Sequence, residues 1–203
     1  DLKEANQTLE QKVIDRTKKI ESQNLEIRSS IQYASKIQSA LLPQDEELNK
    51  LLPSYFILSK PKDIVSGDYY WVVHKYCKII IAVADCTGHG VPGAFMRMLG
   101  VSFLNKVVNE NGIAEPDRIL NELRENVILS LKQKGERETS KDGMDMAICS
   151  IDLKNMQLRF AGANNPMIMI RKENNEYTII EKRADVMPVG VYSRMSELTL
   201  HEI

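Results

Sequence analysis

Two aspartates stand at the predicted ends of neighbouring β-strands. Asp85 comes directly after the apolar, β-branched run Lys78 to Ala84, and Asp68 opens a second β-rich run that ends at Val73. Because only a short polar turn separates the two runs, we expect them to pair as an antiparallel hairpin. This pairing would bring both carboxylates to the same end of one sheet.

Such a pair of carboxylates suggests metal chemistry. Two acidic groups close together repel each other unless a cation or a proton lies between them. Oxygen ligands from carboxylates, backbone carbonyls and water are the ligands that Mg²⁺ and Mn²⁺ prefer. The spacing therefore predicts a divalent metal site on Asp68 and Asp85. The alternative is that Asp85 only caps the helix that follows it, since short glycine-containing motifs recur by chance.

The residues after Asp85 predict a sharp turn followed by a helix. The turn is rich in glycine, which allows the backbone to reverse. Pro92 suits a first helical turn because it has no N–H to lose, and apolar residues recur at helical spacing from Gly93 to Val101. The carboxylate of Asp85 is thus expected between a buried strand and the start of a helix.

Five motifs occur along the chain in a recognisable order. They are Ser66–Tyr70, Asp85–Ala94, Asp142–Ala147, Gly162–Pro166 and Met187–Gly190. From about Ile31 onward the sequence thereby resembles SpoIIE-type members of the metal-dependent Ser/Thr phosphatase (PPM) superfamily. The resemblance implies an α+β fold, a PPM-type α-β-β-α sandwich of two antiparallel sheets. It also implies hydrolysis of phosphoserine or phosphothreonine on a partner protein with two Mn²⁺ or Mg²⁺ ions.

The resemblance also implies roles for individual residues. By motif match, Asp85 would bridge both metal ions and Asp68 would bind one of them directly or through water. The backbone carbonyl of Cys86 would replace the glycine carbonyl usual in the family. Two cations about 3.5–4 Å apart turn a shared water into hydroxide near neutral pH, so no side-chain nucleophile is required. Asp142 and Asp145 are weaker candidates for a further metal or phosphate contact, and a role in a polar turn is favoured for them.

Three features depart from the family pattern or have a simpler explanation. The family's downstream acidic motifs have no match before Ile203, so we expect a domain that is incomplete at its C-terminus and inactive, or nearly so, by itself. His89 is interpreted as a solvated or turn-stabilising residue rather than a general acid. Arg97 could orient a phosphoprotein, but an exposed helical arginine is usually a solvated charge.

The first 42 residues contain no proline or glycine and predict a signalling helix in a parallel, homodimeric coiled coil. Its apolar seam consists of Val13, Ile20, Ile27, Ile31, Ala34 and Leu41. Thr17, Asn24 and Gln38 fall at the remaining core positions, where polar residues fix register at a cost in stability. The alternative is a helix packed along its own domain, because three leucines lie off the seam. A hinge is expected at 43–54 and the phosphatase domain at 55–203.

Composition limits the possible partners. Lys+Arg 27 against Asp+Glu 28 gives a net charge of −1, which provides no electrostatic case for binding nucleic acid or an anionic membrane. Cys77, Cys86 and Cys149 lack zinc-site spacing and are expected to be free thiols of a cytoplasmic protein. No apolar run approaches the roughly 18 residues that could span a bilayer, so a membrane anchor would lie upstream in a longer parent.

Two functions remain open. The first is a Mn²⁺/Mg²⁺-dependent Ser/Thr phosphatase at the output end of a bacterial signalling protein with an upstream sensor domain. By family analogy its substrate would be a phosphorylated regulator of the anti-sigma-antagonist kind. The second is a non-catalytic relay, in which the domain binds a partner and the coiled coil reports the geometry of the dimer.

Overall fold

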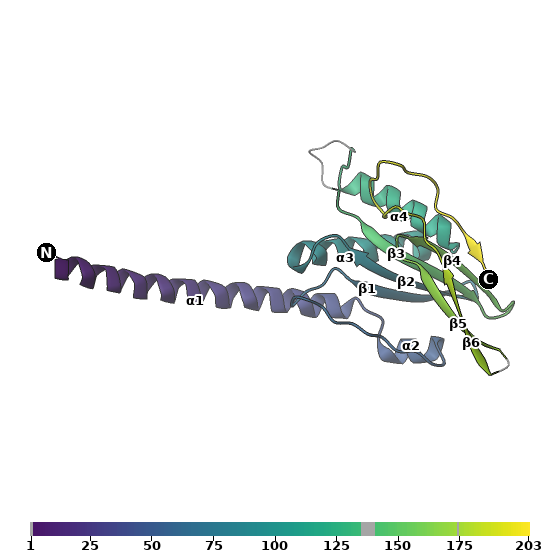
Figure 1. The fold of residues 1–203 in the computed structure, drawn as a ribbon, viewed down its shortest axis with the longest axis horizontal. Helices are drawn as coiled ribbons and strands as arrows, with labels where there is room; N and C mark the ends of the chain where they lie inside the picture. Colours follow the sequence, from purple (N-terminus) through teal and green to yellow (C-terminus); the bar gives the residue numbers. More distant parts are fainter. Residues whose placement is uncertain (1, 135–140, 174) are drawn as a thin grey trace.

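The computed structural model describes residues 2–134, 141–173 and 175–203. A single long helix, α1 (Leu2–Ala40), extends away from the rest of the molecule (Figure 1). The helix predicted for residues 1–42 is present and ends two residues earlier than expected. A short helix, α2 (Asp45–Leu51), lies within the segment that was predicted as a hinge. Within the described residues, no helix is long and apolar enough to cross a membrane.

The larger sheet is antiparallel and has the strand order β1-β2-β3-β4-β7. Its strands are β1 (Tyr69–Lys75), β2 (Lys78–Cys86), β3 (Met144–Asp152), β4 (Gln157–Ala163) and β7 (His201–Glu202). The predicted hairpin is confirmed, because Tyr69 pairs with Ala84 and Lys75 with Lys78. The two-residue turn between them places both Tyr76 and Cys77 at positive φ, the backbone conformation of a tight hairpin connection.

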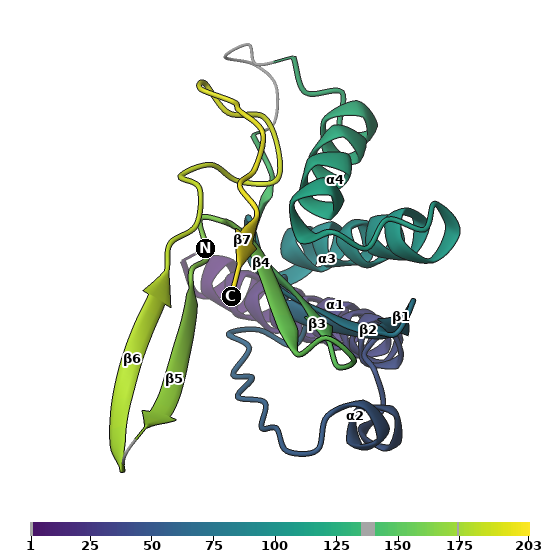
Figure 2. The same cartoon turned by 90° about the vertical axis from the view of Figure 1, so that its right-hand side faces the viewer.

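One face of this sheet is covered by helices. They are α3 (Gly90–Leu104), its π-helical continuation η1 (Asn105–Glu110), and α4 (Pro116–Ser130). Figure 2 shows α3 and α4 on one side of the sheet and α2 on the other. Alternate residues of β3 are buried, as expected for an antiparallel strand with one covered face. The core therefore lies between the sheet and α3/α4.

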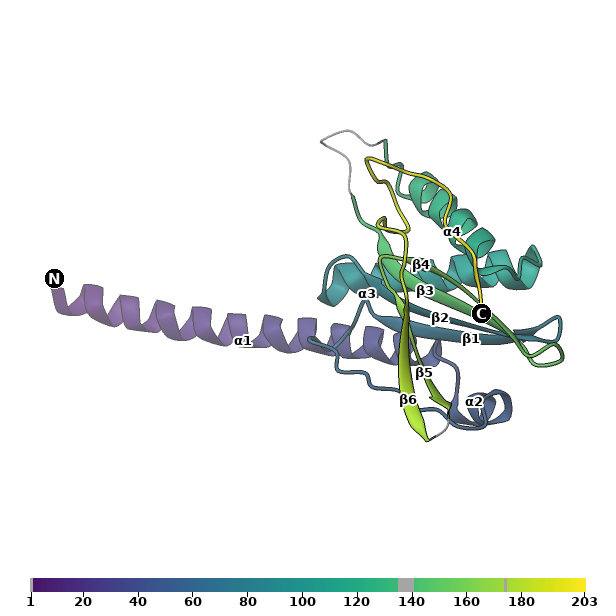
Figure 3. The ribbon, with the colours of Figure 1, turned by 45° about the vertical axis from the view of Figure 1, so that its right-hand side comes forward.

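A second antiparallel sheet is formed by the hairpin β5 (Met167–Glu173) and β6 (Glu176–Lys182). Its strands run across the direction of β1 and β2 (Figure 3). The α+β class, with two antiparallel sheets after a long helix, is therefore confirmed. All three cysteines are free, as predicted.

The C-terminal end of α1 packs on the domain, and this corrects one part of the coiled-coil prediction. Gln38, expected at a core position between two helices, is only 4% exposed and its amide bonds to the domain of its own chain. Val13, Ile20 and Ile27 of the same seam are exposed. The seam is thus shared: its end lies against the domain, whereas its N-terminal part is open to solvent.

Candidate metal centre

Asp68 and Asp85 meet at one end of the larger sheet, as the hairpin predicted. Tyr69 pairs with Ala84, so the next residues, Asp68 and Asp85, lie opposite each other across β1 and β2. Burial, a hydrogen bond with Asp68 and the negative charge of Asp68 raise the pKa of Asp85 above its usual value. The two carboxyls are therefore close enough to share a proton, or to share a cation in its place.

Glycines allow the two segments that carry these aspartates to approach. A Cβ atom on Gly67 would lie 3.1 Å from the Cβ of Cys86 and 3.3 Å from its carbonyl oxygen. A Cβ atom on Gly93 would lie 2.6 Å from the carbonyl oxygen of Gly88 and 3.2 Å from the Cα of Gly67. The start of α3 and the residue before Asp68 consequently pack backbone to backbone around the turn that follows Asp85.

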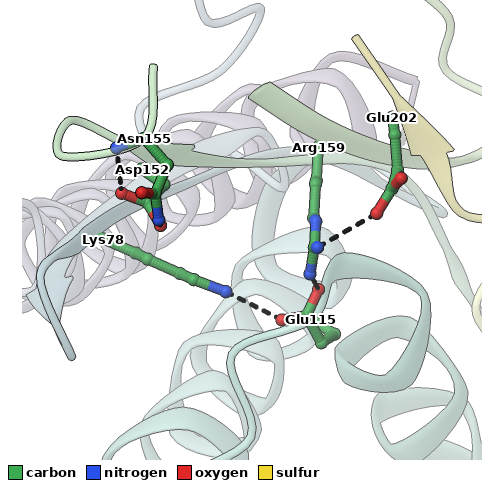
Figure 4. A network of polar contacts seen from close by, with 6 residues as sticks. All are labelled: Lys78, Glu115, Asp152, Asn155, Arg159 and Glu202. Carbon is green, nitrogen blue, oxygen red and sulfur yellow. Dashed lines mark hydrogen bonds and ion pairs between the residues drawn. The ribbon is translucent and has the colours of Figure 1, made fainter. Parts of the chain in front are cut away.

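Carboxylates at the opposite end of the strands are neutralised by basic side chains. Glu115 accepts hydrogen bonds from Lys78 at 2.8 Å and from Arg159 at 2.6 Å (Figure 4). Arg159 also lies 3.0 Å from Glu202. Burial alone would raise the pKa of Glu115, but the two basic partners outweigh it and hold that pKa below its usual value. Both carboxylates of this network, Glu115 and Glu202, therefore contact a basic side chain.

The Asp68–Asp85 end differs, because no basic side chain pairs with these carboxylates. In the part of the chain that the structure describes, neither aspartate forms an ion pair with lysine or arginine. Arg97 lies nearby, but its guanidinium donates to the backbone oxygens of Asp68 at 3.3 Å and Gln38 at 3.1 Å. The expectation of a solvated Arg97 is wrong, since this side chain is only 6% exposed between α1 and β1.

The donor set at this end suits a hard divalent cation. Two carboxylates and the carbonyl of Cys86 offer only oxygen, the ligand type of Mg²⁺ and Mn²⁺. Burial and the charges of Asp85 and Asp68 raise the pKa of the Cys86 thiol to about 12, so the sulfur stays protonated. Over the described ranges, no group of three or more histidine, cysteine, aspartate or glutamate side chains could hold a metal ion. The carboxylates of Asp68 and Asp85 are therefore suitable ligands for Mg²⁺ or Mn²⁺, and they supply part of a coordination shell.

Asp145 lies beside Asp85 on the neighbouring strand, but its carboxylate is hydrogen-bonded to an asparagine. The register of β2 and β3 places Asp145 opposite Asp85. Its carboxylate accepts a hydrogen bond of 2.7 Å from the Nδ2 of Asn164, and its backbone oxygen accepts one of 3.0 Å from Asn165. Asn164 lies in a turn with a φ of 59°, and nothing in the sequence indicates that its side chain would also hold Asp145.

Asp142 belongs to a loop that is fastened to the turn after Asp85. Gly143 exchanges two hydrogen bonds with Thr87: its N–H donates to the Thr87 hydroxyl at 3.1 Å and its oxygen accepts from the Thr87 N–H at 2.9 Å. The buried amide of Gln133 donates to the Asp142 oxygen at 2.6 Å and accepts from Val191 at 3.0 Å. These contacts give the motif a role in loop docking.

Gln38 joins the helical arm to the residues before Asp68. Its side-chain Nε2 donates to the oxygen of Ser66 at 2.9 Å, and its Oε1 accepts from the Ser66 N–H at 3.2 Å. The same Nε2 lies 3.5 Å from the oxygen of Ala94 in α3. Together with the two Arg97 bonds, these contacts connect the end of α1 to both segments of the candidate site. We call this set of contacts the Gln38 clamp.

A second link between the two segments joins His89 and Asp63. The Nδ1 of His89 lies 2.9 Å from the Oδ2 of Asp63. His89 immediately precedes α3 and is 70% exposed, in agreement with the solvated residue expected from the sequence. The sequence did not indicate that Asp63 would be its partner, because 26 residues separate the two.

Comparison with known proteins places these features in a family. The profile of the Stage II sporulation protein E (SpoIIE) family matches residues 77–202. Phosphoserine phosphatase RsbU of Bacillus subtilis (strain 168) is 34% identical over 102 residues, which make up 48% of this chain and 28% of RsbU. This chain therefore spans about a quarter of the length of that curated relative.

Solved structures agree on the fold. The SiaA-PP2C domain of Pseudomonas aeruginosa is 31% identical, with a TM-score of 0.70 over 89% of this chain and 68% of that chain. The PP2C phosphatase domain of SpoIIE from Bacillus subtilis, solved with a fragment of its regulatory domain, is 20% identical with a TM-score of 0.52. That match covers 68% of this chain and 37% of the SpoIIE chain, and it is a likeness of fold.

Proposed function

Because the chain belongs to the SpoIIE family of PPM-type phosphatases, we propose that it is the metal-dependent protein serine/threonine phosphatase part of a bacterial signalling protein. The observation that carries the proposal is the Asp68–Asp85 pair, two adjacent carboxyls that form no ion pair with lysine or arginine among the described residues. A relative 34% identical over 102 residues is a phosphoserine phosphatase.

In this proposal the carboxylates of Asp85 and Asp68 and the backbone carbonyl of Cys86 would hold the Mn²⁺ or Mg²⁺ ions. When bound, the ions supply an activated water and neutralise charge on the phosphoryl oxygens. The protein's own contribution is to fix the ligands. Gly67 and Gly93 let the two ligand-bearing segments pack closely, and Arg97 holds the backbone of Asp68 in place. Asp142 and Asp145 are proposed as lower-ranked ligands, with Asn164 orienting the latter.

The substrate class follows from the family. We propose a phosphoserine or phosphothreonine on a regulatory protein, of the anti-sigma-antagonist kind, in a cytoplasmic pathway. Residues 1–42 would form the signalling helix of a homodimer, 43–54 a connector that includes α2, and 55–203 the phosphatase domain. An upstream sensor would act through α1, and the Gln38 clamp supplies contacts through which the position of this helix could affect Asp68.

A non-catalytic relay is the second candidate. The small number of metal ligands favours a relay, since the described residues contain no group of three histidine, cysteine, aspartate or glutamate side chains able to hold a metal. In a relay the clamp would transmit the geometry of the dimer to a bound partner without any turnover.

The two candidates are separated by phosphate release from a phosphoserine peptide by the full-length protein. The phosphatase requires release that depends on Mn²⁺ or Mg²⁺ and falls by more than about 100-fold in Asp85→Asn, because a neutral amide bridges cations poorly. Asp152→Asn is the matched control, since Asp152 lies at the opposite end of β3. Absence of metal-dependent release, or undiminished release by Asp85→Asn, would favour the relay.

A further inference from the structure

Thr87 lies at the point where β2 leaves the larger sheet. The register pairs Cys86 of β2 with Met144 of β3, so the next residue, Thr87, falls opposite Gly143. A regular antiparallel pair at this position would exchange two hydrogen bonds between main chains. The N–H of Thr87 does donate to the oxygen of Gly143 at 2.9 Å, but the N–H of Gly143 donates to the Thr87 hydroxyl at 3.1 Å. The side-chain hydroxyl therefore replaces a main-chain oxygen at the end of the ladder.

This replacement lets the backbone turn out of the sheet and stay attached to β3. Gly88 and Gly90 follow Thr87 with φ of 87° and 62°, a conformation that glycine adopts readily at the cost of a large loss of chain freedom. The Thr87 hydroxyl fastens the first residue of this turn. The two residues before it are Asp85 and Cys86, the proposed metal ligands. The bond therefore restrains the end of β2 that carries them.

The motif Met187–Gly190, which has no part in the proposed metal centre, holds the same loop on the side away from β2. Val189 exchanges two main-chain hydrogen bonds with the residue after Gly143, at 3.1 and 2.8 Å. A Cβ atom on Gly143 would lie 3.0 Å from the Val189 oxygen, and one on Gly190 would lie 3.2 Å from the Cα of Gly143. Gly143 is thus enclosed between this motif and the hydroxyl of Thr87.

Stability alone gives little reason for the hydroxyl. Thr87 is exposed, so its side chain buries little apolar surface. In a regular ladder the main-chain oxygen of Thr87 would satisfy the N–H of Gly143 without any side-chain hydroxyl. What the hydroxyl adds is the direction in which the chain leaves the sheet after Asp85 and Cys86.

We propose that Thr87 is a positioning residue of the metal centre, which holds Asp85 and the Cys86 carbonyl in place through its bond to Gly143. This inference rests on the proposed phosphatase function and concerns a residue that does not itself touch the metal. Val189–Gly190 acts on the same ligands, because it holds Gly143 from the opposite side. Loss of a group that orients metal ligands in this way typically lowers metal affinity by about 10- to 100-fold.

Binding of Mn²⁺ to the full-length protein, measured by titration calorimetry, tests the proposal. Thr87→Val keeps the shape of the side chain but removes the acceptor for the Gly143 N–H, so the affinity should fall by about 10-fold or more. Thr87→Ser keeps the hydroxyl and should retain the affinity of the wild type. Thr178→Val is the matched control, because Thr178 is exposed on the separate hairpin β5–β6 and should change nothing. Wild-type affinity in Thr87→Val, or an equal loss in Thr87→Ser, would overturn the positioning role.

Amide exchange of Gly143, followed by NMR in EDTA, reports the contact without any metal. Exchange should be faster in Thr87→Val than in the wild type, because the N–H loses its acceptor, and Thr87→Ser should exchange like the wild type. Unchanged exchange in Thr87→Val would show that the hydroxyl does not hold Gly143 and would overturn the proposal.

Gly190→Ala loosens the same unit from the other side, since its Cβ would press on the backbone of Gly143. It should also weaken Mn²⁺ binding. Combined with Thr87→Val, the loss should be smaller than the product of the two single losses, because both changes act through Gly143. Losses that multiply would contradict the shared role. A wild type that binds no Mn²⁺ would instead overturn the proposed function itself, so the two failures are distinguishable.

Discussion

Asp68 and Asp85 lie close enough for a hydrogen bond between their carboxyls, and this proximity favours the protonated form of Asp85 when no metal is bound. Burial, this bond and the charge of Asp68 raise the pKa of Asp85. A carboxyl whose pKa is raised by folding binds its proton more tightly in the folded state. Without metal, stability should therefore fall as pH rises through the ordinary carboxyl range and the raised pKa above it.

Asp85→Asn should consequently raise the temperature of thermal unfolding at neutral pH in the presence of a chelator. The neutral amide removes the repulsion with Asp68. In saturating Mn²⁺ the order should reverse, because an ion that binds only the folded state stabilises it and the variant has lost a ligand. Thermal unfolding of both proteins in EDTA and in Mn²⁺ measures this. A wild type that is the more stable one in EDTA, or equal Mn²⁺ shifts in both proteins, would contradict the assignment.

The sequence was sufficient to bring Asp68 and Asp85 together because the register of a hairpin depends on its short turn. The partners of other site residues depend on contacts between distant segments. Arg97 has the pattern of a surface charge on its helix, and its contacts with the end of α1 and with the backbone of Asp68 lie between segments far apart in the sequence. Asn164 directly follows β4, and its bond to Asp145 requires the pairing of β3 with β4.

The Gln38 clamp connects helix α1 to the rest of the domain. Gln38→Leu should leave the N–H and oxygen of Ser66 without their partners and lower the free energy of unfolding by about 1–3 kcal/mol. It should also weaken Mn²⁺ binding, because Ser66 and Asp68 lie in one segment. Urea unfolding and Mn²⁺ titration measure the two effects.

Gln32→Leu is the matched control for this substitution. Gln32 is exposed on the same helix, so its replacement should change neither the free energy of unfolding nor the affinity for Mn²⁺. If Gln38→Leu leaves the Mn²⁺ affinity unchanged while lowering stability, the clamp only anchors the arm. Equal effects of the two substitutions would show that the clamp has no special role.

The elements that the sequence predicted are those with a strong local pattern. The long helix, the hairpin of β1 and β2, and α3 follow from apolar periodicity, the short turn and the proline near the helix start. The short helix α2 lies between two prolines, where a hinge was the simpler interpretation. The strand β7 has two residues and is fixed by its pairing with Arg159 and Phe160, which no local signal reveals.

The exposed part of α1 extends away from the domain and is accessible to a second copy of the chain. Asn24 lies on the seam and is exposed, as are Ile20 and Ile27. Asn24→Leu should tighten a parallel dimer and lock one register, since a polar core residue lowers stability. The phosphatase of the full-length protein should then lose its response to signal.

Sedimentation of Asn24→Leu beside the wild type measures this effect. The matched control is Gln23→Leu, because Gln23 is an exposed neighbour that lies off the seam. Monomers of both wild type and Asn24→Leu at high micromolar concentration would contradict the coiled coil. The alternative of a helix that acts only by packing along its own domain would then account for α1.

Diffraction from Mn²⁺-soaked crystals of the full-length protein, at the manganese absorption edge, tests whether Asp68 and Asp85 hold divalent metal. We expect an anomalous peak at coordination distance from both carboxylates and near the Cys86 carbonyl, with the hydrogen bond between the aspartates gone. An anomalous map with no peak between them at saturating Mn²⁺, and the two carboxyls still bonded to each other, would contradict it.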